Sequence, residues 1–355
     1  MKVFGVFVGL VVLFAVLFFA TGVSSNVDLA SKLEASATKW NSGEILEGVV
    51  QDDEEKSDSV IFVGDVMLAR DVERRLPLLL PGNPFSEMAE LLSGRVVVGN
   101  FESSIPTEHK ATPDYGMKFS VDPTNLDVLV EGGFTHLSLA NNHSLDHGAN
   151  AYQSTLSELT ARGFVSGGHP TMLASSSISL FNLAEQDFAL VFINATFGYP
   201  DDVEWVPYVE QLNESGKTVI AYVHWGDEYQ LVHNNTQENF SHRLIDAGVD
   251  LIVGHHPHVV QDIGLYKDRL IFYSLGNLVF DQYWDNDVTE GLVLNLLKVE
   301  DDWQVDINPV ESRTVKTQPR EMDPSESSVF FRRLAERSDP ALFEQILDGT
   351  LSLQF

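Results

Sequence analysis

The sequence contains no cysteine. This absence excludes disulfide bonds, thiolate nucleophiles and thiolate metal ligands, so any bound metal must be held by nitrogen and oxygen atoms. Basic residues are also scarce, because 22 lysines and arginines stand against 52 aspartates and glutamates and give a formal net charge of −30. Such a charge repels a phosphate backbone, so nucleic acid is not an expected partner.

The overall composition is that of a folded protein. The chain has 355 residues, of which 44% are hydrophobic and 21% charged. This length can bury a large core, and this balance argues against overall disorder.

The first residues predict export. Residues 4–23 carry no charge and follow Lys2. A helix of that length spans about 30 Å, the thickness of a hydrocarbon core. We therefore expect residues 1–25 to form a transmembrane anchor, with the amino terminus in the cytoplasm and the rest of the chain extracytoplasmic. The small residues at 21–25 leave cleavage as an alternative, in which case the protein is secreted.

Residues 26–58 are expected to form an acidic linker. They are polar, lack sustained periodicity and include four consecutive acidic residues at 52–55. A solvated spacer is the simplest interpretation of such a segment.

From residue 59 onward, short apolar runs repeatedly end in polar residues. The runs are 60–63, 96–98, 137–140, 218–223, 251–253 and 270–275. Continuous Val, Ile and Leu runs are typical of strands buried on both faces. Segments between them are helical in pattern, so the fold class is predicted to be α/β, with its site outside the carboxyl ends of the strands.

Two of the intervening helices have start signals. Residues 150–153 resemble a capping box and precede a helix that stops at Gly163, and residues 235–238 open a second helix that stops at Gly248. Residues 291–310 alternate and are expected to form antiparallel strands. Residues 323–351 predict two short amphipathic helices that pack against the domain.

The densest cluster of chemically active residues is His255-His256-Pro257-His258. Three histidines in four residues are costly to pack as ordinary core, because each ring needs hydrogen-bond partners. A solvated histidine run is the alternative. Asp65 and Glu102 are placed to share a metal, although Gly64-Asp65 after a strand also describes a simple turn. The joint occurrence of ligand-type residues after several strands favours one metal site.

The motifs together resemble a known family. They are 64–67, 99–102, 141–143, 224–228, 254–258, and 274–277 continuing through 280–282. In this order they are similar to the CapA family of poly-γ-glutamate capsule proteins, which is related to calcineurin-like metallophosphoesterases. The resemblance covers residues 59–310 and leaves residues 311–355 as a helical extension.

The resemblance implies a four-layer αββα sandwich with ligands from five motifs. The implied metal ligands are Asp65, Glu102, Asn142, His224, His256 and His258. Glu102 is the preferred shared carboxylate, with Asn100 the alternative at that motif, and His143 is the implied general acid.

Other residues of the motifs are candidates for supporting roles. Candidates for further ligands, or for groups that hold the ligands in place, are Asn100, Asn141, Glu228 and His255. Candidates for contacting substrate or shaping loops are Trp225, Asn277, Asp281 and Gln282.

One position departs from the superfamily pattern. Its first motif is Asp-x-His, and here Met67 stands in place of the histidine. A thioether is a poor ligand for hard or borderline cations, so the expected cofactor is one or two divalent ions. Mixed imidazole, carboxylate and amide ligands favour Mn, Fe or Zn.

Three functional interpretations remain open. The first is a metal-dependent, hydrolase-like site that acts in capsule or poly-γ-glutamate synthesis or export, in contact with a synthase complex or an anionic polymer. The second is a component of that machinery that binds the polymer without cutting it. The third is a general extracytoplasmic metallophosphoesterase.

Overall fold

A computed structural model describes residues 46–47, 57–79, 82–353 and 355. Within these residues no helix is both long enough and apolar enough to cross a membrane. The predicted anchor, and almost all of the predicted linker, lie outside the described residues.

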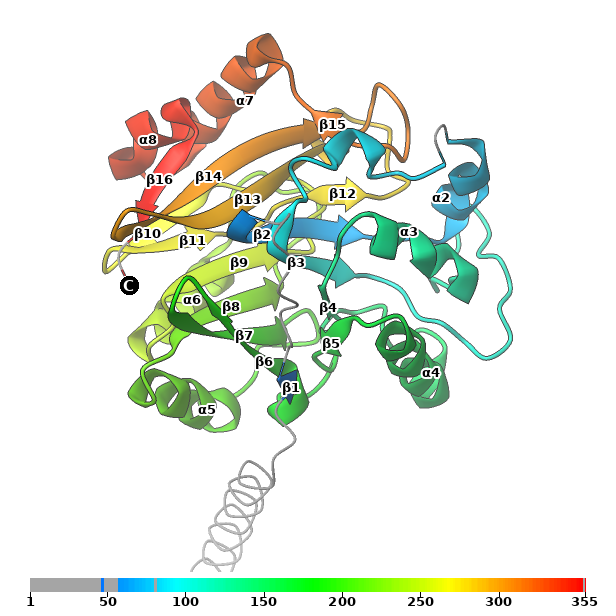
Figure 1. Cartoon of the computed structure of the whole chain (residues 1–355), viewed down its shortest axis with the longest axis horizontal. Coiled ribbons are helices and arrows are strands. Elements are labelled where there is room, and N and C mark those ends of the chain that lie inside the picture. Colours follow the sequence, from blue (N-terminus) through cyan, green and yellow to red (C-terminus); the bar gives the residue numbers. More distant parts are fainter. Residues whose placement is uncertain (1–45, 48–56, 80–81, 354) are drawn as a thin grey trace, which may run out of the picture. The chain divides into compact units, whose positions relative to one another are not determined.

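The described chain forms two β-sheets (Figure 1). The first has the order β1-β6-β7-β8-β9-β11-β10. In it, β7, β8, β9 and β11 are parallel neighbours, whereas β6 and β10 pair antiparallel at the two sides. Its strands are β1 (Leu46–Glu47), β6 (Ile178–Leu183), β7 (Gln186–Asn194), β8 (Thr218–His224), β9 (Leu251–His255), β10 (Ile263–Tyr266) and β11 (Arg269–Phe272).

The second sheet has the order β15-β14-β13-β2-β3-β4-β5, with β12 beside β2 and β16 beside β14. Strands β2 to β5 run parallel, and β13 and β14 form the expected antiparallel pair. Its strands are β2 (Ser57–Val66), β3 (Gly94–Phe101), β4 (His136–Ser138), β5 (Val165–Gly167), β12 (Asn277–Val279), β13 (Glu290–Val299), β14 (Asp302–Glu311), β15 (Arg320–Glu321) and β16 (Thr350–Leu353).

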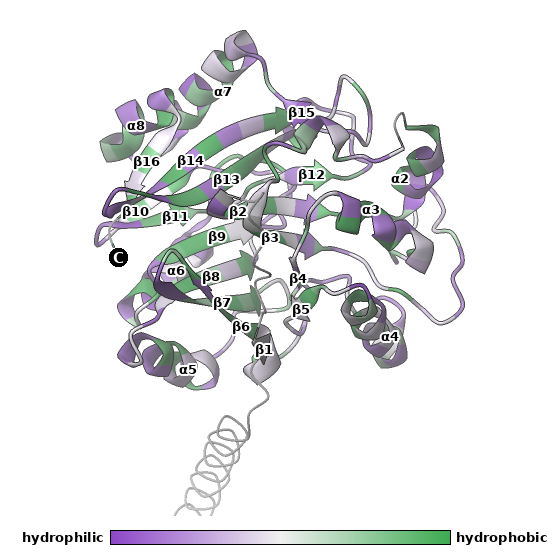
Figure 2. Cartoon of the chain, in the orientation of Figure 1, coloured by the Kyte–Doolittle hydropathy of each residue, from purple (hydrophilic) through white to green (hydrophobic). Residues whose placement is uncertain are grey.

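The two sheets pack against each other through an apolar core. Phe62 and Val98 of the second sheet belong to one buried cluster with Phe192, Tyr222 and Val253 of the first. The Tyr222 hydroxyl also donates a hydrogen bond to the Val63 carbonyl, which ties β8 to β2. The strands are mostly apolar and the helices more polar in Figure 2, as burial on both faces of the sheets requires.

Helices cover the outer faces of the sheets. A second buried cluster joins the outer face of the second sheet to α2 (Arg70–Arg75), α3 (Asp127–Glu131) and α4 (Gly148–Ala161). On the first sheet lie α5 (Asp202–Glu214) and α6 (Asn235–Asp246), whose Trp205 and Phe240 rings are in contact. The predicted α/β class is therefore confirmed.

The C-terminal helices α7 (Pro324–Arg337) and α8 (Phe343–Asp348) pack on the domain as expected. Phe330, Leu334 and Ile346 belong to the buried cluster between the sheets. Val329 lies outside that apolar face and is 61% exposed.

Two helix starts and several strands differ from expectation, and the segment 311–355, predicted as helical, also contains the strands β15 and β16. Helix α4 begins after His147, and no side chain caps it, so the predicted capping box at Asn150 was wrong. Helix α6 is capped one residue earlier than predicted, by Asn234 in a capping box with Gln237. The sequence motifs also missed β6 and β7, because neither ends in a ligand-type cluster.

Candidate metal centre

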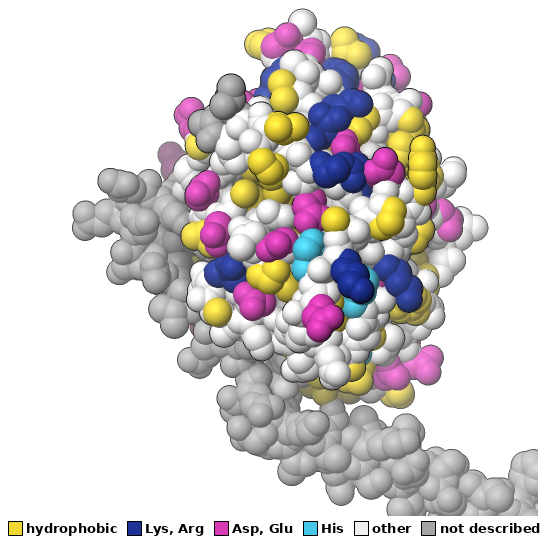
Figure 3. Space-filling model, turned by 90° about the vertical axis from the view of Figure 1, so that its right-hand side faces the viewer, with side chains coloured by type: hydrophobic (Ala, Val, Ile, Leu, Met, Phe, Trp, Pro, Cys, Tyr) yellow, Lys and Arg dark blue, Asp and Glu magenta, His cyan; other side chains and the backbone are white. Residues whose placement is uncertain are grey.

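The carboxyl ends of five strands bring the predicted ligands together. Asp65 lies at the end of β2 and Glu102 directly after β3, while His224 ends β8. Asn142 follows β4, and the histidines 255–258 continue β9. The strands β2 and β3 point toward the right-hand edge of Figure 1, and Figure 3 looks onto that edge, where histidine side chains are visible among charged ones.

A close backbone approach holds Asp65 in place. A Cβ atom on Gly64 would lie 1.8 Å from the Gly276 carbonyl oxygen, so only glycine fits there. This approach lets the Asp65 N–H donate to the Gly276 carbonyl at 3.0 Å, and β12 pairs with β2 beside it. The glycine of the Gly-Asp motif is therefore needed for close packing, and it lies within β2 rather than in a turn.

Amide side chains organise the two carboxylates. Asn100 Nδ2 lies 2.8 Å from Asp65 Oδ1 and 3.4 Å from Glu102 Oε2. Asn141 Nδ2 in turn donates to Asn100 Oδ1 at 2.9 Å. These bonds position Asp65 and Glu102 through a chain of two amides, and all four side chains are buried.

The histidines surround these carboxylates. His258 Nδ1 lies 3.4 Å from Asp65 Oδ2, and His258 Nε2 lies 3.9 Å from Glu102 Oε1. His224 Nε2 lies 2.7 Å from Asn142 Oδ1. His256 and His258 have φ angles of 104° and 60°, so both hold a left-handed conformation that is unfavourable outside glycine. Strain of this kind is typical of functional sites.

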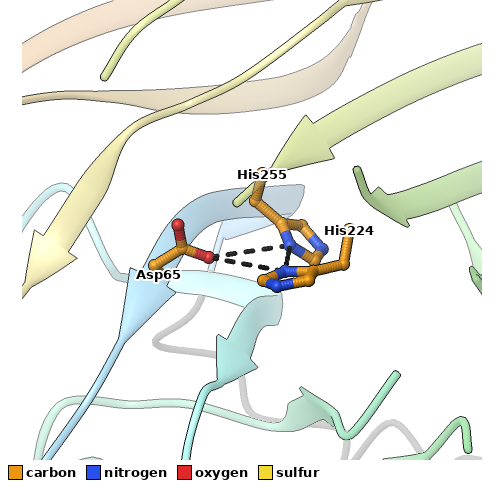
Figure 4. Close-up of side chains that lie close together, drawn as sticks. All are labelled: Asp65, His224 and His255. Carbon is orange, nitrogen blue, oxygen red and sulfur yellow. Dashed lines mark hydrogen bonds and ion pairs between the residues drawn. The ribbon is translucent and has the colours of Figure 1, made fainter. Parts of the chain in front are cut away.

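Three overlapping groups of buried side chains have the spacing to hold a metal ion. They are Asp65, His224 and His255; Glu102, His224 and His256; and Asp65, Glu102 and His258. Figure 4 shows the first group, in which His224 and His255 face each other beside Asp65. The second and third groups share Glu102 and contain only residues predicted as ligands from the sequence.

The unpartnered atoms of the cluster fit a cation. Glu102 Oε1 and His256 Nδ1 are buried without a hydrogen-bond partner among the described residues. Burial, followed by the neighbouring charge of Asp65, raises the pKa of Glu102 well above its ordinary value. Burial also opposes ionisation of Asp65, but the hydrogen bond and charge of His258 hold its pKa at about 2. Two buried carboxylates of this kind are stable together when a positive ion lies between them.

The imidazoles are ready to bind such an ion at neutral pH. Burial lowers the pKa of His256 to about 3 and that of His255 to about 4, and it lowers the pKa of His224 well below its ordinary value. Neutral imidazole is the form that ligates metals.

His255 orients His224. The two Nδ1 atoms lie 2.7 Å apart, so one of them carries the proton between them. When His224 Nδ1 is the donor, Nε2 of the neutral ring carries no proton and can act as a ligand atom next to Asn142 Oδ1, which lies 2.7 Å from it. His255 thus has two possible positions, beside His224 as its hydrogen-bond partner or as a ligand in the group with Asp65 and His224.

Met67 is part of the core beneath the site. Its side chain is fully buried in the cluster on the outer face of the second sheet, and its sulfur accepts from the Ala69 N–H at 2.9 Å.

His143 lies at the rim of the cluster with a partner of its own. Its Nε2 is 3.7 Å from Glu102 Oε1, and its Nδ1 is 2.8 Å from Asp146 Oδ2. The Phe119 ring stacks on the imidazole with centroids 4.0 Å apart. The sequence interpretation missed Asp146, although its spacing of three residues from His143 was visible.

Comparisons with known proteins agree with this architecture. Residues 59–282 match a family described as "Bacterial capsule synthesis protein PGA_cap". The chain belongs to this family. The resemblance seen in the motifs is thus confirmed, and the matched residues include every candidate ligand.

The PGA_cap chain has relatives over most of its length. The "PGA biosynthesis protein CapA" of Bacillus subtilis (strain 168) is 28% identical over 91% of this chain and 86% of its own. The "Capsule biosynthesis protein CapA" of Bacillus anthracis is 28% identical over 81% of this chain and 75% of its own. A "Probable polyglutamine synthesis accessory protein" of Mycobacterium tuberculosis (strain ATCC 25618 / H37Rv) is 24% identical over 63% of this chain and 74% of its own.

In this PGA_cap chain the remaining candidates support the loops around the site. Trp225 is fully buried and donates to the Tyr273 carbonyl at 2.8 Å. Asn277 Oδ1 lies 3.0 Å from His258 Nδ1, and Asn277 Nδ2 donates to Gln282 Oε1 at 3.0 Å. Asp281 forms an ion pair with Arg70.

A pocket of about 480 Å³ opens beside the cluster, and His143, His258 and Glu228 line it. A substrate in this pocket would therefore contact the general-acid candidate and one ligand candidate.

Proposed function

We propose that this chain acts at the cell surface in the synthesis or export of poly-γ-glutamate, through a metal-dependent, hydrolase-like site. The observation that carries the proposal is the buried cluster of Asp65, Glu102 and four histidines, in which Glu102 Oε1 has no hydrogen-bond partner among the described residues. The relatives' names, which refer to capsule, PGA and polyglutamine synthesis, support the process. The uncharged segment 4–23 supports attachment to the membrane, with the folded part outside.

The two sheets with outer helices are compatible with the four-layer metallophosphoesterase arrangement that the motifs imply. In that arrangement, one ion would be held by Asp65, Glu102 and His258. A second would be held by Glu102, Asn142, His224 and His256. Ligands of this mixture favour Mn, Fe or Zn. When bound, such ions lower the pKa of a coordinated water and supply a nucleophile at neutral pH.

The chain's own residues perform the remaining steps. The pocket admits the substrate next to His143, and His143 Nε2 is placed to give a proton to the leaving group. Asp146 accepts a hydrogen bond from the other ring nitrogen, Nδ1–H, and its charge stabilises the doubly protonated ring, which is the form that can donate a proton from Nε2.

The test uses the full-length chain in detergent micelles. Metal content is measured by mass spectrometry, and hydrolysis is measured with a chromogenic phosphodiester and with a γ-glutamyl polymer. His256→Ala should abolish stoichiometric metal and hydrolysis, whereas His242→Ala should preserve both, because His242 stacks on Tyr266 away from the cluster. A metal-free wild type, or an active His256→Ala variant, contradicts the proposal.

Met67 favours a second candidate function, in which the site binds the polymer without cutting it. The position that carries a ligand in the superfamily motif contributes only to the core here. Metal and polymer binding without hydrolysis of either substrate would support this function. Hydrolysis of the phosphodiester alone would support a general phosphoesterase.

A further inference from the structure

Arg70 is a buried cation in the wall of the site pocket. It begins α2 just beyond the strand that carries Asp65, and it lines the same pocket as His143 and His258. Only 8% of the residue is exposed. Its φ angle is 52°, a left-handed conformation that is unfavourable for an arginine. The fold therefore holds Arg70 in place although its backbone prefers a negative φ angle, and strain of this kind is typical of functional sites.

The guanidinium is fixed by aromatic rings and by one ion pair. It lies 4.5 Å from the centre of the Phe119 ring and 5.5 Å from that of Phe280. Nη2 donates to Asp281 Oδ1. Phe119 also stacks on His143, so one ring sets the position of the cation relative to the general-acid candidate.

Most of the hydrogen-bonding capacity of this guanidinium is unused. An arginine has five N–H donors, and a buried donor without a partner is costly. Among the described residues, the side chain's hydrogen bond goes from Nη2 to Asp281, and Nε is buried with no partner. A fixed guanidinium that keeps N–H donors beyond the one given to Asp281 matches a planar oxyanion such as a carboxylate.

The mouth of the pocket is aromatic and exposed. Tyr115 is 96% exposed and Trp284 is 65% exposed, and both line the pocket together with Tyr229. Trp284 and Tyr229 form an edge-to-face pair with centroids 5.7 Å apart. Exposed aromatic groups around a cavity are suited to the flat amide groups and methylene stems of a peptide-like chain.

The acidic residues of the pocket favour a singly charged ligand group. Glu228 and Asp114 also line it, and their charges oppose a dianionic phosphate more strongly than a single carboxylate. We propose that Arg70 binds a free carboxylate of a γ-glutamyl chain, while the aromatic mouth covers the chain's backbone. This assignment rests on the proposed function and adds a specificity-determining residue to it.

Isothermal titration of the full-length, metal-loaded chain in detergent micelles tests the assignment. The probes are a γ-glutamyl oligomer, the same oligomer with its free carboxylates converted to amides, and inorganic phosphate. Wild type should bind the carboxylate oligomer at least about tenfold more tightly than the amide oligomer, as expected for a charge-assisted contact. Arg70→Gln should remove this preference without changing metal content.

Arg74→Gln is the matched control. Arg74 lines the same pocket but its guanidinium already pairs with Asp71 and Asp114. This variant should keep the preference within about twofold, which is well below one decade of affinity. If Arg70→Gln unfolds, Asp281→Asn provides the second variant, because it releases Nη2 and should strengthen binding of the carboxylate oligomer.

Two results would overturn the assignment. One is equal affinity of wild type for the carboxylate and amide oligomers, or a preference for phosphate. The other is an unchanged preference in a folded Arg70→Gln variant. Failure of the proposed function can be told apart from failure of this assignment. The first appears as a wild type without metal, or as a His256→Ala variant that still hydrolyses the substrates.

Discussion

His143 and the partly buried Asp146 form a pair, with 2.8 Å between His143 Nδ1 and Asp146 Oδ2. Asp146 Oδ2 also accepts from the Phe119 N–H at 2.7 Å. Since Phe119 stacks on His143, this one carboxylate fixes both the ring nitrogen and the ring that packs against it. The pair keeps the opposite nitrogen, Nε2, directed toward Glu102.

Asp146→Asn should impair turnover without removing metal. The substitution removes the charge that stabilises protonated His143, so general-acid catalysis should weaken. General acids contribute about 10²–10⁴-fold, and we expect kcat to fall by about 10–100-fold. Steady-state kinetics with parallel metal analysis checks this. Asp127→Asn, which alters an exposed partner of Arg162, is the control and should behave as wild type. Equal kcat values for the two variants would remove Asp146 from the mechanism.

Glu102→Gln should raise the melting temperature, relative to wild type, in the absence of metal and reduce the stabilisation that added metal gives. The raised pKa of Glu102 means that its ionised form is disfavoured in the folded protein, so its contribution to stability falls as the pH rises above its ordinary pKa. In the presence of a chelator at neutral pH, the variant should melt at least about 2 °C higher than wild type. With metal added, wild type should gain more stability than the variant, because ligand binding stabilises the folded state.

Thermal melts of both proteins, with chelator and with added Mn or Zn, measure this crossover. Parallel shifts of the two proteins under all conditions would mean that Glu102 is not a ligand.

His136→Phe should reduce sensitivity to acid. His136 lies on β4, away from the cluster, and burial lowers its pKa to about 4 from an ordinary value of 6.5. Its stabilising contribution is therefore complete above pH 6.5 and is lost as the pH falls toward 4. Through proton linkage, this group alone lowers the free energy of unfolding of the wild type by about 2 kcal/mol between pH 7.5 and pH 5. Urea unfolding at pH 7.5 and pH 5 should show that much less loss in the variant; an unchanged pH dependence would contradict the burial effect.

Gly64→Ala should damage both fold and site. The added Cβ would overlap the Gly276 carbonyl, so β2 and β12 must separate, at a cost of about 1–3 kcal/mol. Asp65 would move with the strand, and metal affinity should fall. Gly163→Ala serves for comparison: its φ is 85° but no atom lies within 4 Å of the new Cβ, so only backbone strain of about 1 kcal/mol is expected. Denaturant unfolding and metal titration compare the two, and equal losses would rule out the close contact as the cause.

The strand ends could be predicted from the sequence because the information is local. An apolar run followed by Asp, Glu or His identifies both a buried strand and its chemical end, as at Val60–Asp65 and Leu251–His255. Parallel strands then bring these ends together without further information.

The contacts that complete the pocket were not predictable in this way. Arg70 meets Asp281 across 211 positions of sequence, and its direction depends on a left-handed backbone that no residue preference indicates. The facing of His224 and His255 likewise depends on the register between β8 and β9. Asp146 is the exception, since it lies within the same loop as His143.

The pairing of β2 has a consequence for how the protein is made. This early strand, which carries Asp65, lies between β3 on one side and β13 on the other, and it also pairs with β12. A chain emerging from the ribosome therefore holds an apolar strand whose partners on one side are still more than 200 residues away. Such long-range closure is slow and leaves the strand edge exposed to association with other chains. We therefore expect the Asp65 cluster to be completed late in folding. A truncated translation product that ends before β12 lacks Asn277, whose Oδ1 lies 3.0 Å from His258 Nδ1.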